Sequence, residues 1–193
     1  MRSLKCFIIS MAVLVFFSCS KENQTEGKAN IAGNWVFVGL QNRTTSINSY
    51  ITNGHTSTDV LFSSYKSSRG TGKVSITSDS IIGSGIGYSY NLFQRLTDYE
   101  DNVLSSDDSI LIPSSAMPAN SSIKFEYIGK DSVHYISGTL TGSNGSGTSL
   151  TTGAKISLTG DTLVLTSGIY FNDTANAAPF QISGTVVTTL KRQ

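Results

Sequence analysis

The sequence predicts an all-β, antiparallel domain, and the period of its apolar residues is the first reason. Ile123, Phe125 and Tyr127 fall on one face of an extended segment, and Lys124 and Glu126 fall on the other. Period-two alternation of this kind is typical of antiparallel strands that bury one face. Turn residues separate such segments at short spacing, and no long amphipathic helical pattern interrupts them. The sequence therefore predicts an antiparallel sandwich or barrel.

The expected strands run along most of the chain after residue 31. The dense apolar segment 35–38 opens the series, and the segment 186–190 closes it. Residues 156–158 are expected to pair with residues 163–165 across a tight turn. No exact repeat links the segments, which argues against a propeller or a solenoid.

Turn chemistry marks several connections. Asn53-Gly54 is a favoured two-residue hairpin turn, and Gly160-Asp161 fits the same role. The Gly- and Ser-rich segment 142–148 is predicted to be a surface loop. The segment 114–122, which follows Pro113 and contains Pro118, is predicted to be another.

The N-terminus has the pattern of a targeting signal. Arg2 and Lys5 precede an apolar segment, residues 6–17, which is too short for a membrane-spanning helix of about 20 residues but suits a signal peptide. The segment ends at Ser18-Cys19, which resembles a lipobox, the recognition site of lipoprotein signal peptidase. The resemblance implies removal of residues 1–18 and a lipid on Cys19. The alternative is an ordinary thiol after a conventional leader.

The rest of the chain is expected to divide into a tether and one domain. Residues 19–30 are polar and aperiodic after the cysteine, as in a flexible tether. Residues 31–193 have the length of a single domain. No cysteine follows Cys19, so this domain depends on packing and strand pairing rather than disulfides.

The charge balance does not favour nucleic-acid binding. The net charge is +1 for the whole chain and becomes −1 when Arg2 and Lys5 leave with the leader. Proteins that bind nucleic acid usually carry a strongly basic face.

Motifs for metals, cofactors and catalysis are missing or incomplete. The Gly-x-Gly-x-Gly segment 83–87 runs into an expected strand rather than the helix that a phosphate-binding loop needs, so it is interpreted as a bend or a close backbone approach. The acidic residues between 98 and 108 lack the spacing of a calcium loop. Two isolated histidines do not predict a zinc or copper site, and no Gly-x-Ser-x-Gly motif is present. We therefore expect no cofactor, no metal and no enzymatic activity.

Aromatic residues on the expected strands are the candidates for ligand binding. Inward side chains of a closed barrel either fill a core or line a cavity. An apolar cavity with tyrosine hydroxyls would suit a small molecule. The candidates are Tyr88, Tyr90, Phe125, Tyr127 and Tyr135.

Gly33-Asn34-Trp35, at the start of the first expected strand, resembles the Gly-x-Trp motif of lipocalins and related calycins. The resemblance implies an up-and-down antiparallel β-barrel over residues 31–193. It also implies that Trp35 plugs one end of the barrel and that a C-terminal cation, Lys191 or Arg192, packs across it. The order of leader, lipidated cysteine, tether and strands is similar to that of lipocalin-like bacterial lipoproteins.

The leading expectation is thus a non-enzymatic lipocalin-like lipoprotein of the outer membrane. Its partners would be the membrane, through lipid on Cys19, and a small apolar molecule or glycan. The alternative is a solid barrel whose surface engages a protein partner. A hydrolase without a recognisable motif ranks third.

Overall fold

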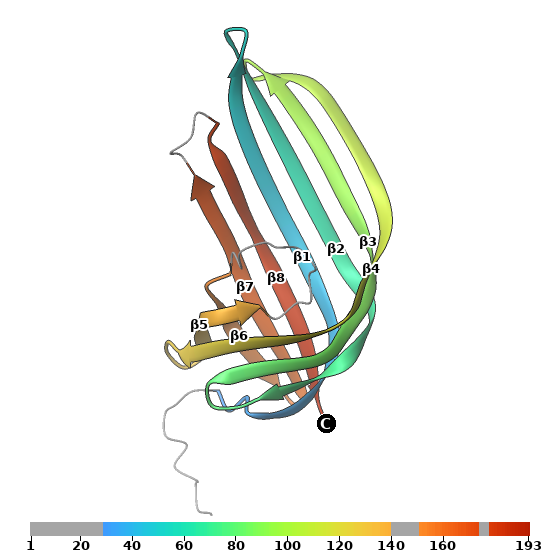
Figure 1. The fold of residues 1–193 in the computed structure, drawn as a ribbon, viewed down its shortest axis with the longest axis vertical. Coiled ribbons are helices and arrows are strands. Elements are labelled where there is room, and N and C mark those ends of the chain that lie inside the picture. Colours follow the sequence, from blue (N-terminus) through green and yellow to red (C-terminus); the bar gives the residue numbers. More distant parts are fainter. Residues whose placement is uncertain (1–28, 140–150, 174–177) are drawn as a thin grey trace, which may run out of the picture.

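The chain folds as an antiparallel β-meander whose hydrogen bonds run in a ring. The computed structural model describes residues 29–139, 151–173 and 178–193. These residues form eight strands: β1 (Gly33–Thr52), β2 (His55–Ile76), β3 (Ser80–Glu100), β4 (Val103–Tyr127), β5 (Ser132–Thr139), β6 (Gly153–Thr159), β7 (Thr162–Asp173) and β8 (Phe180–Arg192). Each strand pairs with the next, and β8 returns to β1 (Figure 1). The prediction of an all-β, up-and-down barrel is confirmed.

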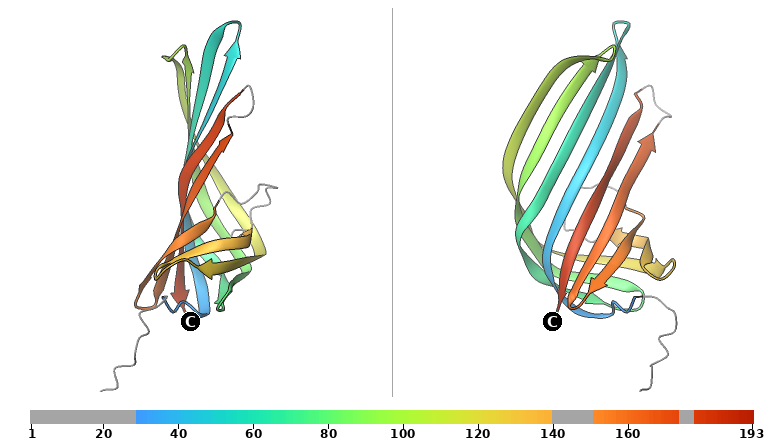
Figure 2. Two further views of the ribbon diagram at one scale, coloured as in Figure 1. Left: turned by 90° about the vertical axis from the view of Figure 1, so that its left-hand side faces the viewer. Right: turned by 180° about the vertical axis from the view of Figure 1, so that it is seen from behind.

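The ring is closed over only part of its height, because its strands differ in length. Strands β1 to β4 have 20 to 25 residues, whereas β5 has eight and β6 has seven. The link between β5 and β6 consists of three paired positions, from Ser132–Lys155 to His134–Gly153. Beyond these short strands the remaining six continue upward as a single twisted layer (Figures 1 and 2).

We therefore distinguish two regions. The closed barrel contains the ends of the strands near Trp35, together with β5 and β6. The open sheet contains the other ends in the order β4-β3-β2-β1-β8-β7, and it consists of residues 41–52, 55–66, 90–100, 103–114, 166–173 and 180–187.

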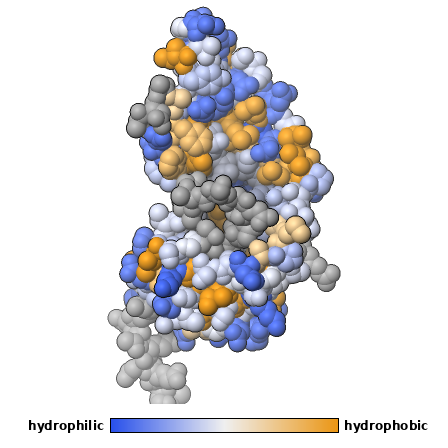
Figure 3. All heavy atoms as spheres, in the orientation of Figure 1, coloured by the Kyte–Doolittle hydropathy of each residue, from blue (hydrophilic) through white to orange (hydrophobic). Residues whose placement is uncertain are grey.

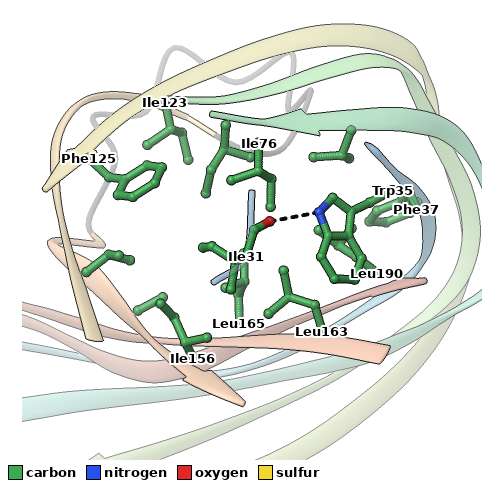
Figure 4. Close-up of a cluster of buried hydrophobic side chains, with 14 of the residues drawn as sticks. Ile31, Trp35, Phe37, Ile76, Ile123, Phe125, Ile156, Leu163, Leu165 and Leu190 are labelled. Atoms are coloured by element: carbon green, nitrogen blue, oxygen red, sulfur yellow. Dashed lines mark hydrogen bonds between the residues drawn. The ribbon is translucent and has the colours of Figure 1, made fainter. Parts of the chain in front are cut away.

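The hydrophobic core lies inside the closed barrel. Its side chains come from every strand, and many are less than 2% exposed, including Trp35, Ile81, Phe125, Leu163 and Leu190 (Figure 4). The alternation of apolar and polar residues along the strands produces this core, because every second residue of a strand points inward. Burial of apolar side chains at about 25 cal/mol per Å² is the main stabilising term.

A short N-terminal segment covers the lower end of this core. The Ala29 amide donates to the Lys130 carbonyl over 2.8 Å, and the Ile31 side chain is fully buried. The Ile31 carbonyl accepts a hydrogen bond of 3.0 Å from the Trp35 indole nitrogen (Figure 4). The chain therefore enters the barrel through its closed end.

The predicted turns are confirmed, and one predicted loop is wrong. Asn53 and Gly54 both have positive φ in the turn between β1 and β2, and Gly160 has φ of 58° before β7. The segment 114–122, predicted as a loop, lies within β4. That part of β4 pairs with β3 and has β5 beside it only from Ser122 onward, and prolines are tolerated in such edge strands.

Other segments lie within strands or outside the described part. The run of glycines at 83–87 is part of β3, where register shifts flank Ile86. An added Cβ on Gly87 would meet Pro118 at 3.2 Å, which agrees with a close backbone approach. The predicted leader, Cys19, most of the tether and the loop 142–148 lie outside the described residues. Within the described part, no helix is long and apolar enough to span a membrane.

Candidate functional site

Trp35 and Arg192 meet at the closed end of the barrel. The Arg192 guanidinium carbon lies 4.8 Å from the centroid of the Trp35 ring, and the indole is completely buried. Gly33 has φ of 139°, a conformation that L side chains rarely adopt. The other candidate cation, Lys191, instead pairs with Asp161 over 3.4 Å. This arrangement seals the end of the barrel and leaves no room there for a ligand against the indole.

The structure divides the five aromatic candidates between two places. Tyr88 and Tyr90 lie where the closed barrel meets the open sheet, together with Tyr65, which the sequence analysis did not single out. The ring centroids of Tyr65 and Tyr90 are 4.3 Å apart, and those of Tyr88 and Tyr90 are 5.7 Å apart. Burial raises the pKa of the Tyr65 and Tyr88 hydroxyls, which therefore remain protonated at neutral pH.

The other three candidates belong to the wall and lower end of the closed barrel. Phe125 is buried and packs edge-on against Tyr127 at 5.5 Å. The Tyr127 hydroxyl donates to the Ala29 carbonyl over 3.0 Å. The Tyr135 hydroxyl lies 3.4 Å from the Ser167 hydroxyl. These contacts hold strands and the N-terminal segment together, so the five candidates do not converge on one site.

A concave surface lies instead on the outer face of the sheet. Leu40 points into the core, so its neighbour Gln41 points outward, and strand pairing places Lys66 and Val187 beside Gln41. The next outward residue of β1, Arg43, has Ser64 beside it in the same way. These side chains line a groove of about 550 Å³, with Thr185, Asn91 and Phe93 at its sides.

Two further hollows continue this groove along β2, β3 and β4. The second, of about 490 Å³, shares Lys66 and Asn91 with the first. The third, of about 300 Å³, shares Ser89 and Ser115 with the second and extends to Gly87. An added side chain on Gly87 would crowd Thr71 and Pro118 at 3.2 Å. We call this series of three hollows the outer groove.

The outer groove combines two cations with hydroxyl, amide and apolar side chains. Arg43 and Lys66 both line it, and no aspartate or glutamate lines any of its three hollows. The Arg43 guanidinium carbon lies 5.5 Å from the centroid of the Phe62 ring. Among the described residues, the four ion pairs of the structure include neither Arg43 nor Lys66. Both cations are therefore available to a ligand.

The acidic residues are dispersed elsewhere. Arg95 pairs with Asp107 over 2.6 Å, and His55 pairs with Asp101 over 2.7 Å at the tip of the open sheet. Asp59 lies opposite Asp98, where burial and then the Asp98 charge raise the pKa of Asp59. Across the described ranges, no three histidine, cysteine or acidic side chains are grouped to hold a metal ion.

The inner face of the open sheet is partly apolar. Leu96, Ile110 and Phe171 fall on it by strand register, and they are 41%, 57% and 40% exposed. Figure 3 shows apolar side chains scattered among polar ones over the upper half of the molecule. This face continues upward from the Tyr65, Tyr88 and Tyr90 rings.

Sequence reasoning missed the outer groove because its residues are ordinary polar residues on the outward faces of strands. Only the pairing of β8, β1, β2 and β3 brings Thr185, Arg43, Ser64 and Phe93 into one row.

A comparison of the whole chain with protein-family models, curated proteins and solved structures finds no match.

Proposed function

We propose that the protein is a lipid-anchored, non-enzymatic glycan-binding protein of the outer membrane, and that the outer groove holds its ligand. The observation that supports this proposal is the continuity of the groove. Three adjoining hollows run along one face of the sheet and share lining residues from one hollow to the next. An extended ligand fits such a surface better than a compact one does.

The side chains of the groove match the chemistry of a sugar chain. Sugar hydroxyls both donate and accept hydrogen bonds, and so do the amides of Gln41 and Asn91 and the serine hydroxyls. The Phe93 ring offers an apolar surface against which the C–H face of a sugar ring can pack. Arg43 and Lys66 complement a carboxylate or sulfate group on the sugar. We therefore propose an acidic oligosaccharide as the ligand class.

An apolar small molecule is less well supported as a ligand. Sites for such molecules are enclosed and mostly apolar. Core side chains occupy the described interior of the closed barrel, and Phe125 and Tyr127 pack against one another there.

A protein-binding module is the second candidate function. The observation that favours it is the exposure of apolar side chains on the open sheet, such as Ile110 and Phe171. Exposed apolar patches on a soluble domain commonly mark interaction sites.

Calorimetric titration tests the glycan proposal. A soluble form that begins at residue 20 is titrated with uronic-acid-containing oligosaccharides and with their neutral counterparts. Hydrogen bonds to charged groups contribute about 1.5–3 kcal/mol, so Arg43→Ala is expected to weaken binding of the acidic sugars by roughly 10- to 100-fold. Lys124→Ala, which removes an exposed lysine outside the groove, serves as the matched control. Binding that is absent, or that is equally strong in Arg43→Ala, contradicts the proposal.

The anchor is tested separately. Cys19→Ala is expected to abolish incorporation of a labelled fatty acid and to move the protein from the detergent phase to the aqueous phase. Continued labelling of the variant would show that the lipobox interpretation is wrong.

A further inference from the structure

The upper part of β4 forms a long edge of the sheet. Among the described residues, β5 pairs with β4 only over residues 122–127. From Val103 to Ser121, β4 has β3 on one side and no described strand on the other. Figures 1 and 2 show this segment as the outer margin of the open sheet. An edge of this kind presents unpaired backbone N–H and C=O groups to any further strand.

The centre of this edge is unusually apolar for a solvent-exposed strand. Ile110, Leu111 and Ile112 follow one another and are 57%, 61% and 37% exposed. Natural edge strands are usually interrupted by charges or prolines. Here such residues flank the apolar segment, with Asp107 and Asp108 before it and Pro113 after it. The flanking residues therefore discourage pairing with another strand, whereas the apolar centre of the edge does not.

We infer that this edge pairs with the same edge of a second copy of the chain, antiparallel and centred on Leu111. In this register Leu111 lies opposite its own equivalent, and Ile110 lies opposite Ile112 of the other copy. Asp108 lies opposite Ser114, so no carboxylate faces another. Cross-strand apolar pairs stabilise a sheet, whereas like charges directly opposite one another destabilise it.

The charges also select the register. A centre near residue 108 would bring the Asp107 and Asp108 side chains of both copies together. A centre on Ser109 would place Asp108 opposite Ile110 and Asp107 opposite Leu111. Only when the centre moves to Leu111 does every apolar residue of the segment meet an apolar partner. The edge is self-complementary, as a two-fold interface requires.

The other margin of the open sheet is a poorer partner. Strand β6 pairs with β7 over residues 162–166, and Thr151 bridges to Ile169. Only a short part of β7 remains for a new strand. Pairing of β4 with β7 would also be heterologous and would not close on itself. The two-fold pairing of β4 joins two open sheets into one and limits the assembly to a dimer.

Cysteine cross-linking tests the register. The full protein, purified in detergent from its own cells, carries Leu111→Cys and is treated with a mild oxidant. Directly opposed Cβ atoms in an antiparallel pair are about 4.5–5.5 Å apart, close to the separation that a disulfide needs. A dimer-sized product is expected. Wild type controls for cross-linking through Cys19, and Tyr170→Cys, on the other margin and 64% exposed, controls for random collision.

Charge variants test the same contact without covalent chemistry. Leu111→Lys and Leu111→Glu are each expected to weaken dimerisation at least tenfold in analytical ultracentrifugation, because each opposes two like charges. An equal mixture of the two is expected to recover a heterodimer. Since Leu111 is largely exposed, both variants keep the core intact, which a circular dichroism melt checks.

Three outcomes would overturn the inference: a wild-type protein that stays monomeric at high micromolar concentration, a dimer unaffected by either charge variant, or a Leu111→Cys cross-link to a different protein. The last would show that the edge accepts a foreign strand. A failure of this inference is distinguishable from a failure of the glycan proposal, because the latter is measured with Arg43→Ala, which lies outside the β4 edge.

Discussion

The closed barrel and the open sheet consist of the same long strands, yet they differ in what the inward side chains meet. In the closed barrel, β5 and β6 complete the ring, and residues such as Phe125 and Leu165 are 1% exposed. In the open sheet, no described strand lies opposite the inner face, and Phe171 is 40% exposed. Alternation alone therefore does not make a core. Burial requires a facing wall, and here two short strands supply that wall.

This difference in burial leads us to expect that the closed barrel determines stability and that the open sheet determines recognition. The closed barrel contains most of the buried apolar side chains and the cation over Trp35. The open sheet has two exposed margins, β4 and β7, and it contains the Arg43 end of the outer groove. Residues in the closed barrel are expected to govern the free energy of unfolding, and residues in the open sheet are expected to govern binding.

The largest effect is expected from the side chain at the centre of the closed end. Trp35→Ala removes a fully buried indole and its hydrogen bond to Ile31, and it should lower the free energy of unfolding by about 3–5 kcal/mol. Ile51→Ala, at the tip of the open sheet and 75% exposed, should change it by less than about 0.5 kcal/mol. Urea denaturation followed by circular dichroism measures both values. Equal effects would mean that the two regions do not differ in this way.

A matched pair of phenylalanines compares the regions directly. Phe125→Ala is expected to cost about 3–5 kcal/mol, because the residue is enclosed by the core. Phe171→Ala should cost less than about half as much, because water already reaches this ring and because its one described ring contact, with Phe180, has a centroid distance of 6.3 Å. The same denaturation measurement applies. If Phe171→Ala proved the more damaging, the open sheet would have to be covered in solution.

The cation over Trp35 should contribute less than the ring beneath it. Arg192→Ala is expected to lower the free energy of unfolding by about 0.5–2 kcal/mol, the range of a cation–π contact. Lys191→Ala removes a neighbouring exposed ion pair with Asp161 and should cost at most about 1 kcal/mol. Thermal melts of both variants rank the two cations. A larger loss in Lys191→Ala would contradict the assignment of Arg192 to the barrel end.

The smallest effect is expected at the tip of the open sheet, where it depends on pH. The hydrogen bond with Asp101, and then its charge, raise the pKa of His55 above 6.5, and the same hydrogen bond lowers the pKa of Asp101 below 3.8. The His55 contribution is complete below pH 6.5 and is lost as the pH rises through the raised pKa. The Asp101 contribution is complete above pH 3.8 and is lost as the pH falls through the lowered pKa.

The pairing of the two hairpin tips should thus be tightest between those limits. An NMR titration of the His55 ring and the Thr56 amide, which donates to Asp101 over 2.9 Å, follows it. Asp101→Asn should return the pKa of His55 toward 6.5. A pKa of His55 that is not raised in the unmodified protein would contradict the contact between His55 and Asp101.

Local patterns in the sequence predicted the strands and the tight turns, because both depend on neighbouring residues. The turns at Asn53-Gly54 and Gly160 could be predicted without any knowledge of tertiary contacts. The segment after Pro113 was wrongly predicted as a loop because proline is compatible with a strand when the strand lies at an edge, and the edge is a property of the whole sheet.

The candidate site was harder to predict for the same reason. Tyr65 joins Tyr88 and Tyr90 only through the pairing of β2 with β3. The outer groove depends on the alignment of polar residues from four strands and on the twist of the sheet. The division between a closed and an open region depends on β5 and β6 being short, and apolar periodicity does not determine strand length.

The entry of the chain through the closed end has a mechanical consequence. If Cys19 holds the protein on a bilayer, any load from a ligand passes along the chain to Ala29 and Ile31, which are held at the closed end, and from them to β1. Strand β1 is flanked by β2 and β8 along almost its whole length, so a pull along its axis shears many hydrogen bonds at once instead of opening them one by one. The connection between tether and domain therefore lies at a strand that is held on both sides.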